Sequence, residues 1–540
     1  MACAKMTVAN MNASLSERGL LIAWSVIAAI AIGLQLGGYP LLDADEGRNG
    51  EVGREMAATN DYVMPRFDGL LYLDKPIIYF AAEAATMEVV GPTEFAARFP
   101  SWLFTVATAL LLAWFAESPS PGASRHPLPR GEGRGEGPLA ALIFLSMPLT
   151  IAFARTVIFD SALSFFITLA LIAFYLERPT LAWAGMAFGV ITKGPVALAV
   201  PLIVAIPFAI WHKKLRHLAS IAGLLLFVVI IAPWVWAISR VVPDFLQYVL
   251  VTETAQRLTT GALKRTGPPW YFIPYLIGGA LPWSFGIFGR RTTDNRQPLL
   301  DRYLTLWIAV PFIFFSLSQS KRPQYILPLM PAIALLVARR TSHRATAIAL
   351  AVVGALLLAA LPFVHVDYPL TPALILGISA LVCGVLAIFK RGAISVMALS
   401  IPMLLIPIVT NPVMRAIAAR RSTQSLVAQV RPYLGSDTEV IGIEAFTGSM
   451  AFYLQRPIVI VTPNAEELTS NYIIRHYSKF ANDPRSTIRP MSWLPNAFDR
   501  TRPRVIFVRD NDRANRALAE QHGARLAGAG AHFVAYTMPR

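Results

Sequence analysis

The sequence predicts an α-helical polytopic membrane protein with a soluble α/β domain at its C-terminal end. Two observations predict the membrane part: 55% of the 540 residues are hydrophobic and only 15% are charged, and the mean hydropathy is +0.52. Such a chain has too few charges to cover a water-exposed surface of this size. A third observation is the change to short β-rich runs after residue 416. We therefore expect a membrane domain over 1–416 and a soluble domain over 417–540.

The basic character of the chain does not indicate nucleic-acid binding. The formal net charge is +16, but no basic domain with interleaved aromatic side chains stands apart from the apolar runs. Lys and Arg in cytoplasmic loops, and cations that face phosphate, explain the excess better. Of the two cysteines, Cys3 lies in the N-terminal tail and Cys383 in an apolar run, so no disulfide framework is expected.

The apolar runs predict the membrane spans. A helix needs about 20 apolar residues to cross the hydrocarbon layer, and about thirteen runs approach that length. The first extends from Leu20 to about Leu36 and lacks a small-residue cleavage site, so we expect an uncleaved helix and not a signal peptide. The other runs begin near Glu94, Leu139, Ser161, Leu181, Val196, Ala219, Tyr271, Tyr303, Ile326, Ala345, Thr371 and Ile394.

Basic clusters predict the orientation. They lie at 213–216, 290–291, 339–344 and 390–391, all on one side of the membrane if every run crosses. The positive-inside rule places that side, and the N-terminus, in the cytoplasm. The low-complexity stretch from Glu117 to Gly137 is then a cytoplasmic connector. An odd number of crossings places the C-terminal segment outside.

The C-terminal segment alternates short strands with helical patterning. We expect strands at Val440–Ile443, Ile458–Val461 and Val505–Val508, and a polar helix over Asp512–His522. This alternation is typical of a small α/β domain.

The first outer loop, residues 38–92, concentrates charged residues between two apolar segments. Its acidic start is followed by charges at spacings that share one helical face, and the set comprises Asp43, Asp45, Glu46, Arg48, Glu51 and Arg54. Further on, Asp74 and Lys75 precede Pro76 and the apolar stretch Ile77–Val90, which is too short to span and is expected at the interface. A solvated helix with ion pairs would explain any one of these charges. The whole arrangement indicates a polar substrate, because charges at a membrane surface are costly.

Other charged residues fall on the same outer side of the predicted topology. They are Arg155, Asp160, Lys193, Glu253, Arg257, Lys264, Arg265, Lys321 and Arg322, with Tyr325 beside the last two. A purely structural role is an alternative for two of them. Asp160 could simply be a helix N-cap, and Lys193 could simply extend its ammonium to the membrane interface. Several cations at one depth, against the positive-inside trend, indicate a ligand that carries phosphate.

Three segments resemble a known family: DADEGRNGEVGREM, DYVMPRFDGLLYLDKPIIYF and GPTEFAARFPSWLF. They are similar to membrane glycosyltransferases of the GT-C fold, and most similar to the 4-amino-4-deoxy-L-arabinose lipid A transferase branch. That branch is related to protein O-mannosyltransferases. The resemblance extends over the whole chain and includes the TKGP and KRPQYILP segments.

The resemblance implies roles for individual residues. The essential carboxylate of the family corresponds to Asp45, with Glu46 beside it, and Asp160 is a further catalytic candidate. The family's Glu-Lys-Pro motif corresponds to Asp74, Lys75 and Pro76, with Asp in place of Glu. This change puts in doubt a metal role at Asp74, although a divalent ion stays an open expectation. A site built on histidines is not expected in the membrane cavity.

The resemblance also implies a reaction. We expect transfer of 4-amino-4-deoxy-L-arabinose from undecaprenyl phosphate to a lipid A phosphate at the periplasmic face of a bacterial inner membrane, which gives resistance to polymyxin and cationic antimicrobial peptides. The enzyme would act as a monomer among membrane lipids. Charge develops on the carrier phosphate as it leaves, and the residues expected to bind it are Arg48, Lys75, Arg265, Lys321 and Tyr325.

Two other functions fit the same sequence. The first is a GT-C transferase that moves another polyprenyl-phosphate sugar, such as mannose, onto a protein or glycan. The second is a transporter of a lipid-linked sugar. Transporters usually contain internal repeats and bind near the membrane midplane, whereas the charged residues here lie towards one face and the two halves show no repeat.

Overall fold

The computed structural model describes residues 2–118, 136–249, 267–289, 298–340 and 343–539. The chain divides into two compact units. Unit 1 comprises residues 1–35 and 101–410, and unit 2 comprises residues 36–100 and 411–540. The first outer loop and the C-terminal segment therefore fold as one body, and the expected boundary at 416/417 falls inside the helix Asn411–Arg421.

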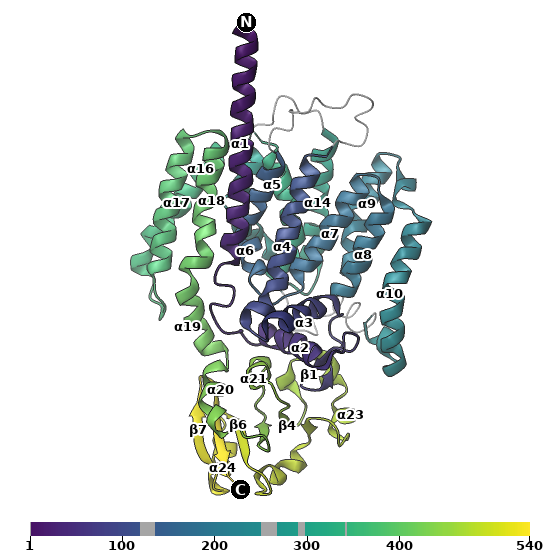
Figure 1. Cartoon of the computed structure of the whole chain (residues 1–540), viewed down its shortest axis with the longest axis vertical. Coiled ribbons are helices and arrows are strands. Elements are labelled where there is room, and N and C mark those ends of the chain that lie inside the picture. The colour runs from purple at the N-terminus through teal and green to yellow at the C-terminus, as the bar shows by residue number, and fades with distance from the viewer. Residues whose placement is uncertain (1, 119–135, 250–266, 290–297, 341–342, 540) are drawn as a thin grey trace. The chain divides into compact units, whose positions relative to one another are not determined.

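Unit 1 is helical, and its helices run side by side (Figure 1). They are α1 (Ala2–Gly33), the later part of α4 (Glu94–Ala116), α5 (Glu136–Leu145), α6 (Pro148–Ala154), α7 (Asp160–Tyr175), α8 (Pro179–Lys193), α9 (Val196–Trp211), α10 (Ile221–Val241), α11 (Phe245–Gln247), α13 (Phe272–Gly279), α14 (Pro298–Leu317), α15 (Met330–Ala338), α16 (Arg344–Ala360), α17 (Thr371–Phe389) and α18 (Gly392–Val409). Short 3₁₀ segments include η3 (Pro269–Tyr271), η4 (Trp283–Phe288) and η5 (Pro323–Leu329).

Helices of unit 1 coincide with the expected apolar runs. Among the described residues, six are long and apolar enough to cross a membrane, or seven if α5 and α6, which meet at a 68° bend, form one span. Other runs are shorter apolar helices, such as α7 and α9. The chain is thus a polytopic membrane protein, and the count of thirteen crossings stays a prediction.

The core of unit 1 is built on large aromatic side chains whose polar atoms are all bonded. Trp283 donates to the Ser146 hydroxyl at 2.9 Å, Trp307 to the Pro328 carbonyl at 2.9 Å, and Tyr303 to the Leu171 carbonyl at 2.7 Å. Buried polar groups without partners would be costly in an apolar interior. These bonds therefore fix the rings where the helices pack.

Unit 2 contains a mixed six-stranded sheet in the order β5-β4-β3-β6-β8-β7. Its strands are β3 (Glu439–Ile443), β4 (Val459–Val461), β5 (Ile488–Arg489), β6 (Arg504–Arg509), β7 (Arg525–Ala529) and β8 (Phe533–Met538). Strands β5, β4, β3 and β6 are parallel, while β8 is antiparallel to both β6 and β7. The three expected strands are confirmed, and β5, β7 and β8 were not expected.

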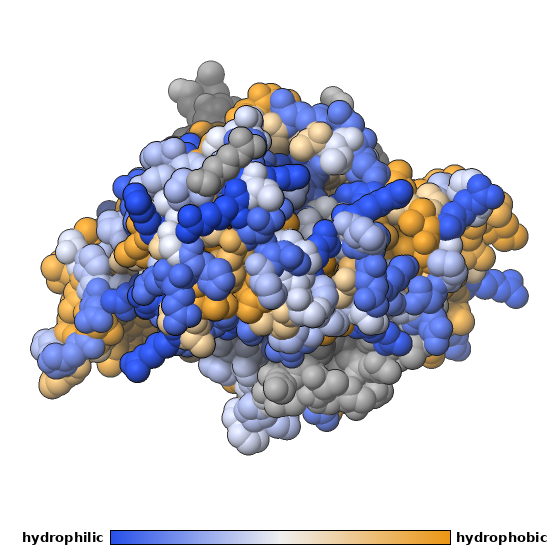
Figure 2. Space-filling view, turned by 90° about the horizontal axis from the view of Figure 1, so that it is seen from below, coloured by the Kyte–Doolittle hydropathy of each residue, from blue (hydrophilic) through white to orange (hydrophobic). Residues whose placement is uncertain are grey.

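Helices and a hairpin complete unit 2. The first loop supplies α2 (Asp45–Thr59), the hairpin of β1 (Arg66–Phe67) with β2 (Leu70–Leu71), and α3 (Ile78–Val90). The C-terminal segment supplies α19 (Asn411–Arg421), α20 (Gln424–Val430), α21 (Gly448–Leu454), α22 (Asn471–Arg475), α23 (Tyr477–Ala481) and α24 (Arg513–Gln521), which confirms the expected polar helix. Hydrophilic side chains cover much of the face seen in Figure 2.

Two glycines allow α2 to pack directly on α21. A Cβ added to Gly47 would lie 2.3 Å from the Ser449 nitrogen, and one added to Gly448 would lie 2.1 Å from the Arg48 nitrogen. No side chain larger than hydrogen fits between backbones at this separation. Asp43, just before α2, also accepts hydrogen bonds from the backbone nitrogen and hydroxyl of Ser449. The start of α2 is therefore fixed by the C-terminal segment.

Candidate functional site

The first turn of α2 places Asp45 and Arg48 side by side. The Arg48 guanidinium lies 2.6 Å from the Asp45 carboxylate, and a second nitrogen donates to the carbonyl and hydroxyl oxygens of Thr469 at 2.9 Å. Acidic residues favour the first turn of a helix, where the backbone N–H groups carry partial positive charge. The Asp45 side chain is 36% exposed, so it is accessible to a substrate while its orientation is held by Arg48.

Glu46 points away from Asp45 into a buried ion pair with Arg98. The Arg98 guanidinium donates to both Glu46 carboxylate oxygens at 2.9 and 2.8 Å, and also to the carbonyls of Leu36, Tyr39 and Pro40. Glu46 is 4% exposed and Arg98 is fully buried. The geometry therefore gives Glu46 a positioning role at the start of α2.

Asp74 anchors the C-terminal segment. Its two carboxylate oxygens accept hydrogen bonds from the backbone nitrogens of Asn471 and Tyr472, at 2.9 Å each. In the described ranges, no group of three His, Cys, Asp or Glu side chains could hold a metal ion. Both oxygens of the Asp74 carboxylate are thus engaged by backbone N–H groups, and a metal ion at Asp74 stays a prediction.

Lys75 lies beside the same anchor. Its ammonium donates to the Asp74 carbonyl at 2.5 Å, and the side chain is half-buried. The carboxylate of Asp74 fixes the backbone on which Lys75 stands, and this arrangement limits where the ammonium can reach.

A buried acidic group lies between α2 and the β1–β2 hairpin. Burial raises the pKa of the Asp68 carboxyl to about 7, although the backbone N–H of Ile458 donates to it. Burial also raises the pKa of Glu51 and, further, that of Glu55, while Arg54 pairs with Glu51 at 2.6 Å. These groups hold the loop together and are too enclosed to meet a large substrate.

A second cluster, in unit 1, joins three predicted site segments. Lys193, at the end of α8, forms an ion pair with Asp160, at the start of α7, and its ammonium lies 5.3 Å from the centre of the Tyr325 ring. Asp160 makes no side-chain cap at the start of α7, so the N-cap alternative is not what the structure shows. The Lys193 ammonium is paired with the Asp160 carboxylate, so it has a partner within the protein and does not simply extend towards the membrane interface.

Lys321 lies in the segment that leads to Tyr325. Its ammonium donates to the Ser318 carbonyl at 2.5 Å and it is 7% exposed. The Tyr325 hydroxyl lies 3.4 Å from the Ser320 hydroxyl, in the same turn. The cluster thus holds two lysines, one carboxylate and one phenol, with cationic charge in excess. Arg265, which was expected to join them, lies outside the described residues.

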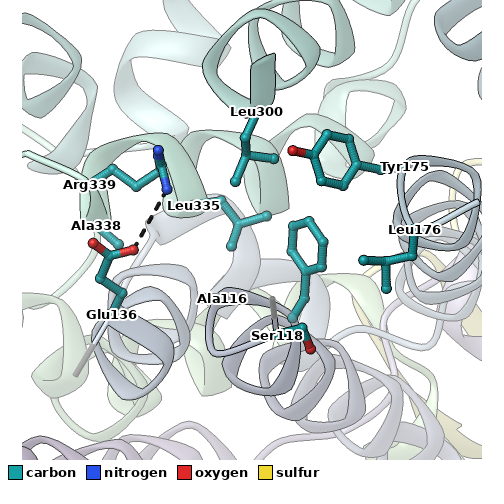
Figure 3. A pocket seen from close by; sticks show the side chains of 10 residues that line it. Ala116, Ser118, Glu136, Tyr175, Leu176, Leu300, Leu335, Ala338 and Arg339 are labelled. Atoms are coloured by element: carbon teal, nitrogen blue, oxygen red, sulfur yellow. Dashed lines mark ion pairs between the residues drawn. The ribbon is translucent and has the colours of Figure 1, made fainter. Parts of the chain in front are cut away.

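Unit 1 also has a small pocket lined by other residues. Figure 3 shows Arg339 paired with Glu136 at 3.7 Å, beside Tyr175, Leu300 and Leu335. Arg339 also donates to Asp301 at 2.9 Å. The volume of about 40 Å³ holds only a few water molecules. This pocket is a structural ion-pair site and cannot admit a sugar.

Sequence reasoning missed the residues that hold the site in place. Arg98 was not singled out, although an arginine near the start of an apolar run is a recognisable signal of a buried functional or structural charge. Arg155, by contrast, was among the charged residues expected on the outer side, but its contacts were not foreseen: its guanidinium donates to the Ile32, Leu34 and Gln35 carbonyls at the end of α1. Ser449 and Thr469 carried no such signal.

The sequence is similar to curated proteins over part of its length. No protein-family model matches the chain. An undecaprenyl phosphate-alpha-4-amino-4-deoxy-L-arabinose arabinosyl transferase of Aeromonas salmonicida is 32% identical over 321 residues, which cover 56% of this chain and 57% of that protein. The protein of the same name in Serratia proteamaculans is 32% identical over 338 residues, with 58% and 59% covered. The chain thus spans somewhat more than half the length of these relatives.

The fold is similar to solved structures over nearly the whole chain. The crystal structure of ArnT from Cupriavidus metallidurans bound to undecaprenyl phosphate covers 96% of this chain and 98% of that one, with a TM-score of 0.81 and 23% identity. Its apo state gives a TM-score of 0.79 with the same identity and coverage. The chain therefore has the polytopic GT-C membrane fold of these ArnT structures, and its sequence is similar to that of curated arabinosyl transferases.

Proposed function

We propose that this chain transfers 4-amino-4-deoxy-L-arabinose from undecaprenyl phosphate to a lipid A phosphate at the periplasmic face of the inner membrane, and thereby supports resistance to polymyxin. The observation that carries the proposal is the 32% identity to transferases of that name. The fold supports it. The Asp45–Arg48 pair within unit 2 and the lysine cluster within unit 1 each have groups that such a reaction needs.

The reaction needs a stabilised leaving group. The bond between the anomeric carbon and the carrier phosphate breaks, its electron pair stays on the phosphate, and an acceptor oxygen forms the new bond to the anomeric carbon. The unit 1 cluster, with Lys193, Lys321 and Tyr325, offers ammonium and phenol donors for the phosphate charge. Charge-assisted hydrogen bonds of this kind are shorter and stronger than neutral ones.

Asp45 is assigned to the acceptor. A phosphate monoester is largely ionised at neutral pH, since its second pKa is about 6. A base is therefore not needed to activate it, and Asp45, held by Arg48, would orient the acceptor. A hydroxyl acceptor would instead require Asp45 to accept a proton.

Replacing Asp45 tests this assignment. We expect Asp45→Asn to abolish transfer of radiolabelled aminoarabinose from undecaprenyl phosphate to lipid A, with protein yield unchanged. Asp61→Asn is the matched control, because Asp61 lies in the same loop and an asparagine oxygen can still accept from the Val63 and Met64 nitrogens. Turnover by Asp45→Asn close to that of the control would remove Asp45 from the mechanism. A chain that moves the lipid-linked sugar but forms no glycosidic bond would be a transporter.

A further inference from the structure

Unit 2 contains a cavity at the carboxyl ends of its parallel strands. Its volume is about 500 Å³. The lining segments follow β3 (Phe446, Thr447, Gly448), β4 (Glu466, Glu467, Thr469) and β6 (Arg509, Asp510, Asn511), and Ala531, His532 and Phe533 come from the start of β8. Asp43 and Ala44, from the first loop, complete the wall.

The position of this cavity is where open α/β sheets bind ligands. The chain passes from β3 outward to β4 and β5, then returns to the other side of β3 to form β6. The crevice at the carboxyl ends of two strands from which the chain departs in opposite directions is the general ligand site of such sheets. Here β3 and β6 are those strands, and the segments that follow both line the cavity.

The backbone around the cavity is locally strained. Glu444, directly after β3, has a φ of +47°, and Ala465 and Thr469, which flank Glu466 and Glu467, have φ values of +58° and +53°. Residues other than glycine rarely adopt this left-handed region, and such positions concentrate at functional sites.

The charges of the lining select the ligand. Four carboxylates, those of Asp43, Glu466, Glu467 and Asp510, line the cavity together with one guanidinium, that of Arg509. Asp510 is already paired, because the Arg516 guanidinium donates to its carboxylate at 2.9 Å. Arg509 lies 3.8 Å from Glu467 and donates to the Glu444 carbonyl, so its charge is largely compensated within the protein. The Glu466 carboxylate has no hydrogen-bond or ion-pair partner among the described residues. A nucleotide or another polyanion would be repelled here.

The remaining groups suit a sugar ring. Thr447, Thr469 and Asn511 supply hydroxyl and amide groups for sugar hydroxyls, and the half-buried Phe533 ring supplies an apolar surface for a sugar face. A second cavity of about 250 Å³ shares Asp43, Thr447 and Phe533 with the first, and adds Arg420 and Arg421. A ligand longer than one ring can therefore continue into it.

We propose that this cavity binds a saccharide that carries a free amino group, with the ammonium held by Glu466. The proposal does not depend on the transfer reaction proposed above, because it concerns binding at the sheet edge of unit 2. No covalent step is involved.

Binding of two matched oligosaccharides tests the proposal. The probes are the tetramer of glucosamine and the same tetramer with every amine acetylated, which removes the charge and keeps the rings. Titration calorimetry uses the full-length chain in detergent, carrying Asp45→Asn so that transfer cannot contribute. We expect saturable binding of the amino tetramer, with at least about tenfold weaker binding of the acetylated one, as expected for loss of a charged hydrogen bond.

Substitutions in the lining locate the binding. Glu466→Gln should weaken binding of the amino tetramer about tenfold. Asp510→Asn should weaken it less, because the Asp510 carboxylate is already paired with Arg516. Both side chains are exposed, so these variants should fold, and an unchanged thermal unfolding midpoint verifies this. Asp437→Asn is the control, because Asp437 is an exposed carboxylate before β3, at the other end of the strand. Equal binding of the two tetramers, no saturable binding, or equal losses in all three variants would overturn the proposal.

Discussion

Neighbouring carboxylates in the first loop have different physical roles. Asp45 is partly exposed and held by one arginine, whereas Glu46 is buried in an ion pair with Arg98. The Asp74 carboxylate accepts hydrogen bonds from two backbone N–H groups. Breaking a buried ion pair costs about 3–5 kcal/mol because it leaves a charge without a partner. Loss of activity on substituting Glu46 would therefore report folding of the loop, while loss at Asp45 reports chemistry.

Lys75 should behave as a phosphate-binding cation. Removing a charge-assisted hydrogen bond of about 1.5–3 kcal/mol lowers binding or rate about ten- to a hundredfold. We expect Lys75→Ala to lose activity in that range, and Lys75→Arg to recover part of it, since a planar fork does not replace a compact charge. Initial rates at varied donor concentration measure the effect.

A lysine outside the proposed site serves as the control for Lys75. Lys213 follows α9 and belongs to the basic cluster predicted to face the cytoplasm. Lys213→Ala should leave the transfer rate unchanged. Equal losses in the two alanine variants would show that charge acts through membrane insertion or stability.

Asp68 should make the stability of unit 2 depend on pH. Its pKa is about 7 in the folded chain against 3.8 for an ordinary aspartate, so the folded state keeps a proton that the unfolded state releases. Its contribution to stability is therefore complete below pH 3.8 and is lost as the pH rises through 7. At about 1.4 kcal/mol per pKa unit, the loss amounts to a few kcal/mol.

Thermal unfolding between pH 4 and pH 8 measures this effect. The wild-type midpoint should fall as the pH rises, and Asp68→Asn should reduce the fall and be the more stable form at pH 8. Glu51 and Glu55, whose pKa values burial also raises, will keep part of the slope. A slope identical to wild type would contradict the role of Asp68.

At the scale of elements, apolar length and strand patterning were predictable but long-range contacts were not. The strands β3, β4 and β6 are buried apolar runs, and they were expected. β5 has two residues and β7 contains two alanines and a glycine, so neither shows such a pattern. The Asp45–Arg48 pair follows from helical spacing. Asp74 binding to Asn471 and Tyr472 does not, because nothing local links residues so distant in sequence.

The contact between α2 and α21 should tolerate no side chain. In Gly448→Ala the new Cβ would lie 2.1 Å from the Arg48 nitrogen and 2.4 Å from the Gly47 carbonyl carbon, so a backbone must move. Overpacking of this kind costs about 1–3 kcal/mol or more. We expect a lower unfolding midpoint and loss of transfer, because Asp45 and Arg48 stand on the displaced turn. Gly435→Ala is the control, with its nearest atoms 3.4 Å away. Normal transfer by Gly448→Ala would show that this turn need not be held so closely.

At the scale of the molecule, the apolar surface of unit 1 is that of a protein in lipid. Of the 18 most apolar consecutive residues in the segment Leu215–Val241, only 11% are buried inside the protein, against 50% in α18. Side chains such as Ile221, Val229 and Trp236 are largely exposed on α10. Exposed apolar surface on this scale is stable only when hydrocarbon covers it.

Reporter fusions test the predicted orientation. Alkaline phosphatase fused after Arg540 should be active, because it folds only outside the cytoplasm, and the same reporter inserted after Arg391 should be inactive. Arg391 lies between α17 and α18, in a basic cluster predicted to be cytoplasmic. Activity at both positions or at neither would overturn the count of thirteen crossings.

Unit 2 is built from two segments that are distant in sequence, and this affects how the protein folds during synthesis. Residues 36–100 leave the ribosome early, yet the partners that complete their fold begin at Asn411. At about 5–20 residues per second, roughly 15–60 s pass before those partners are synthesised. During that interval Asp43, Asp68 and Asp74 lack the backbone N–H groups of Ser449, Ile458 and Asn471. The nascent first loop is thus a client for chaperones and proteases until translation ends, and a ribosome stalled within the membrane domain leaves it permanently unfinished.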